Sequence, residues 1–200
     1  MASIFQDILK RGLQQGILPA RTQAAREWYR DKARRVADSR RSSERIIEDT
    51  PKARKKNNVE IGKMYCYVYD PKWKEKLPYY DTFPCIFMVG PAHGGFYGIN
   101  IHYLPPSLRA KLMDGLYEIT NNRRYDGSTK LKLSYQLLKS TEKLKWFKPC
   151  FKHYLNSHVR SVFIEIPSQQ WDIAMALPSQ KFKKQNQYKV YYDSRQKING

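Results

Sequence analysis

Residues 83–104 set the architecture of this chain: Phe83-Pro84-Cys85-Ile86-Phe87-Met88-Val89, then Gly90-Pro91-Ala92-His93-Gly94-Gly95, then Phe96 to Leu104. The segment 83–89 is apolar on both faces, which predicts a central strand. The glycine-rich segment 90–95 predicts a turn. Residues 96–104 predict another strand, which pairs with the first as a hairpin.

Two more segments complete the predicted sheet. Residues 63–69 are β-branched and aromatic, and residues 159–166 alternate between apolar and polar side chains, so both predict strands. Helices are expected at 107–119, 128–139, 148–156 and 169–176. The result is an α+β fold with a small antiparallel sheet, able to close as an SH3-like barrel, and helices inserted before the last strand.

The N-terminal region predicts two helices. Ser3 can cap the first, at 1–16, and Gly16 can end it. Its apolar stripe either packs on the protein's own domain or docks into a neighbouring subunit. A second, strongly basic helix is expected at about 20–45. The stripe consists of Ile4, Phe5, Ile8, Leu9 and Leu13.

Changes in composition predict four regions. They are a helical basic arm at 1–45, a basic linker at 46–60, an α+β core domain at 61–178 and a basic tail at 179–200. The tail is either a marginal helix or an extended arm.

The charge predicts an anionic partner. Lys and Arg number 37 against 18 Asp and Glu, which gives a net charge of +19 over 200 residues, as in proteins that bind nucleic acid or an anionic surface. No stretch approaches the roughly 18 uninterrupted apolar residues of a membrane span, so no membrane role is expected. The three cysteines form no disulfide framework.

Catalytic patterns are weak. The chain has no Cys-x-x-Cys pair and its four histidines are poorly spaced for zinc. A nuclease would need clustered carboxylates, for which Asp114 and Glu118 are candidates, or an acid–base pair such as His102 with Arg109 or Arg124. The triplet Asp70-Pro71-Lys72 is better explained as a turn. We therefore expect no enzyme activity, no metal and no cofactor.

Cations interleaved with aromatic rings give the stronger signal, because cations suit phosphates and rings can stack on bases. Lysines that cover an ordinary core would give a similar pattern. The candidate nucleic-acid-binding residues are Arg30, Arg34, Arg35, Lys52, Arg54, Lys55, Lys56, Arg123, Arg124, Lys145, Trp146, Lys148, Lys152, Lys181, Lys183 and Lys184.

Several strings of residues are distinctive: Tyr69-Asp70-Pro71-Lys72, Leu77-Pro78-Tyr79-Tyr80-Asp81-Thr82-Phe83-Pro84, Gly94-Gly95-Phe96-Tyr97-Gly98-Ile99-Asn100-Ile101-His102-Tyr103-Leu104-Pro105-Pro106, Phe147-Lys148-Pro149-Cys150 and Trp171-Asp172-Ile173-Ala174. With them, most of the chain after residue 60 resembles the DNA end protector family of T4-like tailed bacteriophages. The resemblance implies a minor virion protein that binds the ends of packaged double-stranded DNA without reading sequence and shields them from exonucleases. It carries over no individual binding residue.

End protection needs phosphate contacts, an aromatic cap and a docking surface, but no catalytic centre. The resemblance also implies other virion proteins as partners in a multi-copy assembly, formed in the host cytoplasm. The same residues suit a structural neck, tail or baseplate component that docks through its N-terminal helices and never touches DNA. A small nuclease is the lesser alternative.

Overall fold

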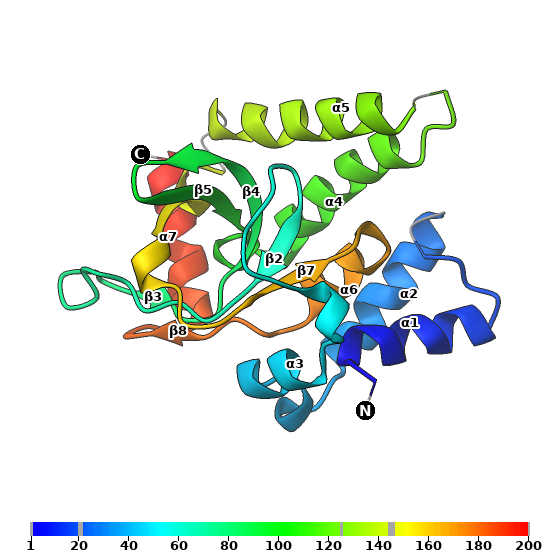
Figure 1. The fold of residues 1–200 in the computed structure, drawn as a ribbon, viewed down its shortest axis with the longest axis horizontal. Helices are drawn as coiled ribbons and strands as arrows, with labels where there is room; N and C mark the ends of the chain where they lie inside the picture. The colour runs from blue at the N-terminus through cyan, green and yellow to red at the C-terminus, as the bar shows by residue number, and fades with distance from the viewer. Residues whose placement is uncertain (1, 20–21, 125, 144–146, 200) are drawn as a thin grey trace.

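The hairpin expected at 83–104 forms the middle of an antiparallel sheet in the computed structural model, which describes residues 2–19, 22–124, 126–143 and 147–199 (Figure 1). Strand β4 (Cys85–Ala92) pairs with β5 (Gly95–Asn100), and Phe87 lies opposite Ile99. Gly94 takes a φ of +68° in the turn, a conformation that glycine adopts without strain.

The sheet has six strands in the order β1-β7-β2-β4-β5-β6, and all its pairs are antiparallel. Its end strands β1 and β6 do not pair with each other, so the sheet is open and the expected barrel does not close. A separate two-stranded sheet joins β3 to β8. The remaining strands are β1 (Lys55–Lys56), β2 (Met64–Cys66), β3 (Tyr80–Asp81), β6 (Phe151–Leu155), β7 (Phe163–Ile166) and β8 (Phe182–Lys183).

Strand β6 replaces the helix expected at 148–156, which was wrong. The spacing of Phe151, Tyr154 and Leu155 fits a helix, but the edge of β5 offers these residues backbone partners. The close approach depends on Gly95, where a Cβ atom would lie 1.8 Å from the carbonyl oxygen of Tyr154. Tertiary pairing therefore overrides local helical periodicity here.

Seven α-helices surround the sheet in the described residues: α1 (Ile4–Gln14), α2 (Gln23–Arg34), α3 (Ser43–Asp49), α4 (Pro106–Thr120), α5 (Gly127–Ser140), α6 (Trp171–Ala176) and α7 (Gln187–Asn199). The helix expected at 20–45 is broken, because α2 ends at Arg34 and the Ser42 side chain caps a new helix by accepting from the N–H of Arg45. The segment 46–60 contains the end of α3 and strand β1. Within the described residues, no helix combines the length and apolarity of a membrane span.

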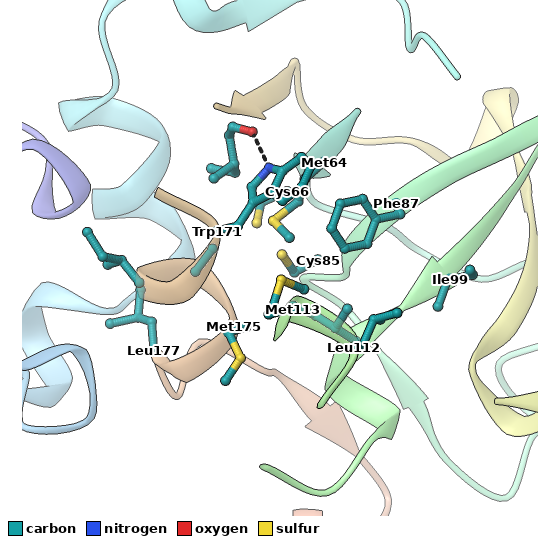
Figure 2. Close-up of a cluster of buried hydrophobic side chains, with 14 of the residues drawn as sticks. Met64, Cys66, Cys85, Phe87, Ile99, Leu112, Met113, Trp171, Met175 and Leu177 are labelled. Carbon is teal, nitrogen blue, oxygen red and sulfur yellow. Dashed lines mark hydrogen bonds between the residues drawn. The ribbon is translucent and has the colours of Figure 1, made fainter. Parts of the chain in front are cut away.

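Alternation along the strands buries both faces of the sheet. On β2, Met64 and Cys66 face the larger core, whereas Tyr65 faces a second cluster rich in tyrosine and phenylalanine. Figure 2 shows the larger core, where α4 and α6 meet the sheet and the Trp171 indole N–H donates to the carbonyl of Ile166 at 3.0 Å. The expected central position of 83–89 is confirmed by β4, which has a neighbour on each side.

Helix α1 packs on the protein's own domain. Ile4, Phe5 and Ile8 are 3%, 3% and 6% exposed and belong to the larger core. Of the two uses left open by the sequence, the structure therefore has the intramolecular one, and these side chains are not exposed to a partner. Leu9 is partly buried against the same core, and Leu13 stays 47% exposed.

Candidate nucleic-acid interface

A pocket of about 470 Å³ opens between the loop 71–79 and strand β6, and we call it the Trp73 pocket. Its walls are largely aromatic, with two lysines, and the lining includes Lys72, Trp73, Tyr79, Tyr80, Tyr103 and Lys152. Its volume falls in the range of about 300–1,000 Å³ that is usual for ligand sites. Figure 1 shows β3, β8 and this loop on the opposite side of the sheet from α1 and α2.

Lysine side chains flank the rings of the pocket. The Trp73 side chain is 57% exposed, and the Nζ atoms of Lys72 and Lys76 each lie 5.1 Å from its ring centroid. Inside, Lys152 Nζ lies 4.1 Å from the ring centroid of Tyr103. These cation–π contacts hold positive charge beside ring faces. Phosphates and bases therefore both find a complementary surface here.

Lys184 fastens the loop that carries Trp73. Its Nζ donates to the carbonyl oxygens of Lys74, Glu75 and Leu77 at 2.7, 2.9 and 3.1 Å. Lys184 has a φ of +69°, which is uncommon for a residue with a side chain. The strained backbone at Lys184 thus accompanies a bond network that orders the loop.

Asp81 of β3 lies beneath the pocket and is 4% exposed. One carboxylate oxygen accepts from the N–H groups of Phe83 and Lys181, each at 3.0 Å. The other oxygen accepts from Asn100 Nδ2 at 3.2 Å and lies 2.6 Å from His102 Nδ1. Through these hydrogen bonds, the Asp81 side chain connects β3 with the residue before β8 and with the end of β5.

His102 extends this network to Ser179, whose Oγ lies 3.3 Å from His102 Nε2. Burial lowers the pKa of His102, although Asp81 opposes the shift. Burial alone would raise the pKa of Asp81, but His102 and the N–H donors bring it below its usual range. The lowered pKa favours the neutral imidazole, and in that form Nδ1–H would donate to Asp81 and Nε2 would accept from Ser179.

The order Ser–His–Asp is that of serine hydrolases, in which the serine must reach a substrate. Here Ser179 is 3% exposed and His102 is fully buried. The network therefore acts in this structure as a lock that holds the segment before β8 against β3.

The pairing of His102 with Arg109 that was considered for acid–base chemistry is not formed through the imidazole. Arg109 is buried and donates to the backbone carbonyls of Leu104, Met175 and His102 at 2.7, 3.1 and 3.1 Å. Burial lowers the pKa of Arg109. The guanidinium thus links α4 to the backbone of residues 102–104 and to the end of α6. The other arginine considered, Arg124, lies exposed between α4 and α5.

Four residues of the predicted basic set lie in the Trp73 pocket or on the segment around β8. Lys152 lines the pocket, Lys183 pairs with Tyr80 in the small sheet, and Lys184 holds the loop. Lys181 precedes β8, with its side chain exposed and its N–H on Asp81.

The other predicted residues lie on other elements. None of those that the structure describes lines the Trp73 pocket: they are Arg34 and Arg35 at the end of α2 and directly after it, Lys52, Arg54, Lys55 and Lys56 on the segment through β1, Arg123 and Arg124 after α4, and Lys148 before β6. Lys145 and Trp146 fall outside the described residues.

Arg30 is a correction to the predicted surface. It is 3% exposed, its Nε lies 2.6 Å from Asp172, and its Nη2 lies 2.7 Å from Asp114. The guanidinium forms ion pairs inside the protein, and these link α2 to α6 and α4. The sequence placed it on a basic face because its partners are 84 and 142 residues away along the chain.

The carboxylates considered for a nuclease either form ion pairs with basic side chains or lie exposed. Asp114 accepts ion pairs from Arg26 at 3.2 Å and from Arg30, while Glu118 is exposed. Asp70 pairs with Lys74 at 3.0 Å within its turn. Across the part of the chain that the structure describes, no group of three His, Cys, Asp or Glu side chains is placed to hold a metal ion.

The main residue that sequence reasoning missed is Trp73, together with Lys72 and Lys76. Beyond the turn at Asp70-Pro71-Lys72, no role was predicted for the segment 72–76, although it shows the interleaving of lysine and tryptophan that singled out Lys145 and Trp146. That pattern was the available signal.

Comparison with known proteins gives one match. A family model described as the phage T4 terminal DNA protecting protein matches residues 16–198. No curated protein and no solved structure matches the chain. The matched region begins just after α1, runs almost to the end of α7 and includes the Trp73 pocket. The chain therefore belongs to the family of phage T4 terminal DNA protecting proteins.

Proposed function

We propose that this protein binds the ends of linear double-stranded DNA without reading sequence and shields them from exonucleases, with no catalytic step of its own. The observation that carries the proposal is the Trp73 pocket, where an exposed indole has two lysine ammonium groups 5.1 Å from its ring centroid. Membership of the terminal DNA protecting family supports the same function.

An end differs from the rest of a duplex because it exposes the face of its last base pair. Lysines bind phosphates anywhere along DNA and give affinity that falls with salt. A ring can stack only on an exposed base, so it distinguishes an end from the interior. The combination of Trp73 with Lys72, Lys76 and Lys152 therefore fits end binding better than general DNA coating.

The proposal also places the protein in the phage particle, among other virion proteins and in several copies. A groove of about 440 Å³ lies between residues 16–18, which follow α1, and the first half of α2, and its lining includes Ile17, Leu18 and Trp28. The side chain of Leu18 is 44% exposed. Such an apolar surface supports a docking role for this face.

The test compares a blunt 30-base-pair duplex with the same duplex closed at both ends by hairpin loops, using fluorescence anisotropy at several salt concentrations. We expect tighter binding to the open duplex and a steep loss of affinity with salt. Trp73→Ala removes stacking worth about 1–3 kcal/mol, and should abolish the preference for open ends. Tyr188→Ala, at a ring that is 73% exposed on α7, is the control and should leave it intact.

Protection is measured directly by adding a double-strand exonuclease to the linear duplex. The wild-type protein should slow its digestion, and Trp73→Ala should protect less well. Equal affinity for open and closed duplexes, or digestion at the rate of bare DNA under saturating protein, would refute end binding. Cleavage of the duplex by the protein alone would refute the non-catalytic part.

A further inference from the structure

The Trp73 pocket is a hollow rather than a flat platform, and this shape limits what it can accept. Its walls come from two sides, the loop 71–79 and strand β6, and enclose about 470 Å³. The rings of Tyr79 and Tyr103 inside are tilted by 37° with centroids 6.1 Å apart. A flush base pair carries two backbones and needs a flat surface, whereas a single base can enter between such walls.

The charges in the pocket match one nucleotide with its phosphate. Lys152 Nζ sits over the Tyr103 ring at 4.1 Å, and Lys72 Nζ lies 5.1 Å from the ring centroid of Trp73. A base held against the rings would bring its phosphate to these ammonium groups. The loop that forms one wall is fixed by Lys184, so the hollow exists before DNA arrives.

We propose that the Trp73 pocket takes up one unpaired nucleotide from the end of the DNA. This inference rests on the proposed function of end binding and names the form of the end that is recognised. Taking a terminal base out of its pair requires unstacking, which is easiest where the base is already single-stranded or weakly paired. The protein should therefore prefer an end with a one-nucleotide overhang or a terminal A·T pair over a blunt end closed by G·C pairs.

The experiment measures competition among four versions of one duplex: a one-nucleotide overhang, a blunt A·T end, a blunt G·C end and a hairpin-closed end. We expect the overhang to bind about tenfold more tightly than the G·C end, with the A·T end between them. Trp73→Ala should remove these differences, and Trp73→Phe, which keeps a stacking ring, should retain them.

A 2-aminopurine placed as the terminal base gives a second readout, because its fluorescence reports stacking. Its emission should change on binding to the wild-type protein and to Trp73→Phe, and the change should be absent when the probe is placed ten pairs from the end. Equal affinity for overhang, A·T and G·C ends, all above the hairpin-closed duplex, would overturn the single-nucleotide pocket and leave end binding standing. Equal affinity for all four would overturn end binding itself.

Discussion

The buried ion pair of Arg30 with Asp172 predicts how much the packing of α2 on α6 contributes to the stability of the protein. Arg30→Met removes the guanidinium that compensates Asp172, which is 2% exposed. Loss of the pair with Asp114 should cost less free energy, because the Asp114 side chain is 33% exposed and stays hydrated without its partner. Breaking a buried ion pair in this way costs about 3–5 kcal/mol, which lowers the melting temperature by about 6–20 °C in a protein of this size.

The pH dependence of the stability of Arg30→Met tests whether the loss comes from the unpaired charge of Asp172. Burial already raises the pKa of Asp172 above its usual value, even beside Arg30, and removing Arg30 should raise it further. The native variant then keeps a proton that the unfolded chain releases above about pH 4. Its free energy of unfolding should therefore rise, relative to wild type, as the pH falls from 8 to 5.

The assay is urea unfolding followed by tryptophan fluorescence and circular dichroism at pH 8 and pH 5. Arg35→Met is the control, because Arg35 is 72% exposed and its surface pair with Asp31 should contribute less than about 1 kcal/mol. Adding Asp172→Asn to Arg30→Met should recover much of the loss at pH 8. A loss below about 1 kcal/mol at pH 8, or an equal loss at both pH values, would refute a buried charge pair.

Three other outcomes follow from the geometry. Gly12→Ala should destabilise the protein by about 1–3 kcal/mol, since a Cβ atom would lie 2.1 Å from Tyr29 Oη where α1 meets α2; unchanged urea unfolding would contradict this contact. Lys184→Met should leave global stability within about 1 kcal/mol but increase amide hydrogen exchange in the loop 71–79; unchanged exchange would show that the loop is ordered without it. Burial raises the pKa of Cys150 to about 12, so this thiol should resist a disulfide reagent at pH 8 until the protein unfolds, and rapid labelling of the native protein would be inconsistent with its burial.

The sequence was sufficient for elements whose partners are near in the chain. The hairpin around Gly94, the helix capped by Ser3 and the two helices α4 and α5 all follow from turn residues, capping or helical spacing. Strand β6 was missed because its helical spacing is genuine, and the pairing that overrides it comes from β5, about 56 residues earlier.

The candidate site was predicted only in part, for the same reason. Lys152, Lys183 and Lys184 were singled out, but Lys152 reaches the pocket through the pairing of β6 with β5. Lys183 and Lys184 come next to the loop of Trp73 through the pairing of β3 with β8, about 100 residues apart. Charge alone does not reveal which cations are internal: Arg30 is buried, whereas Arg34, four residues later on the same helix, is exposed.

The attachment of Lys184 to the loop of Trp73 has a consequence for synthesis. The ammonium group that fastens the loop is made more than a hundred residues after the loop itself. A chain still on the ribosome therefore carries an unfastened loop even when the central hairpin has formed. If the Trp73 pocket binds DNA as proposed, this ability should arise late in folding, and a chain that stops before β8 should form the central hairpin without an ordered Trp73 loop.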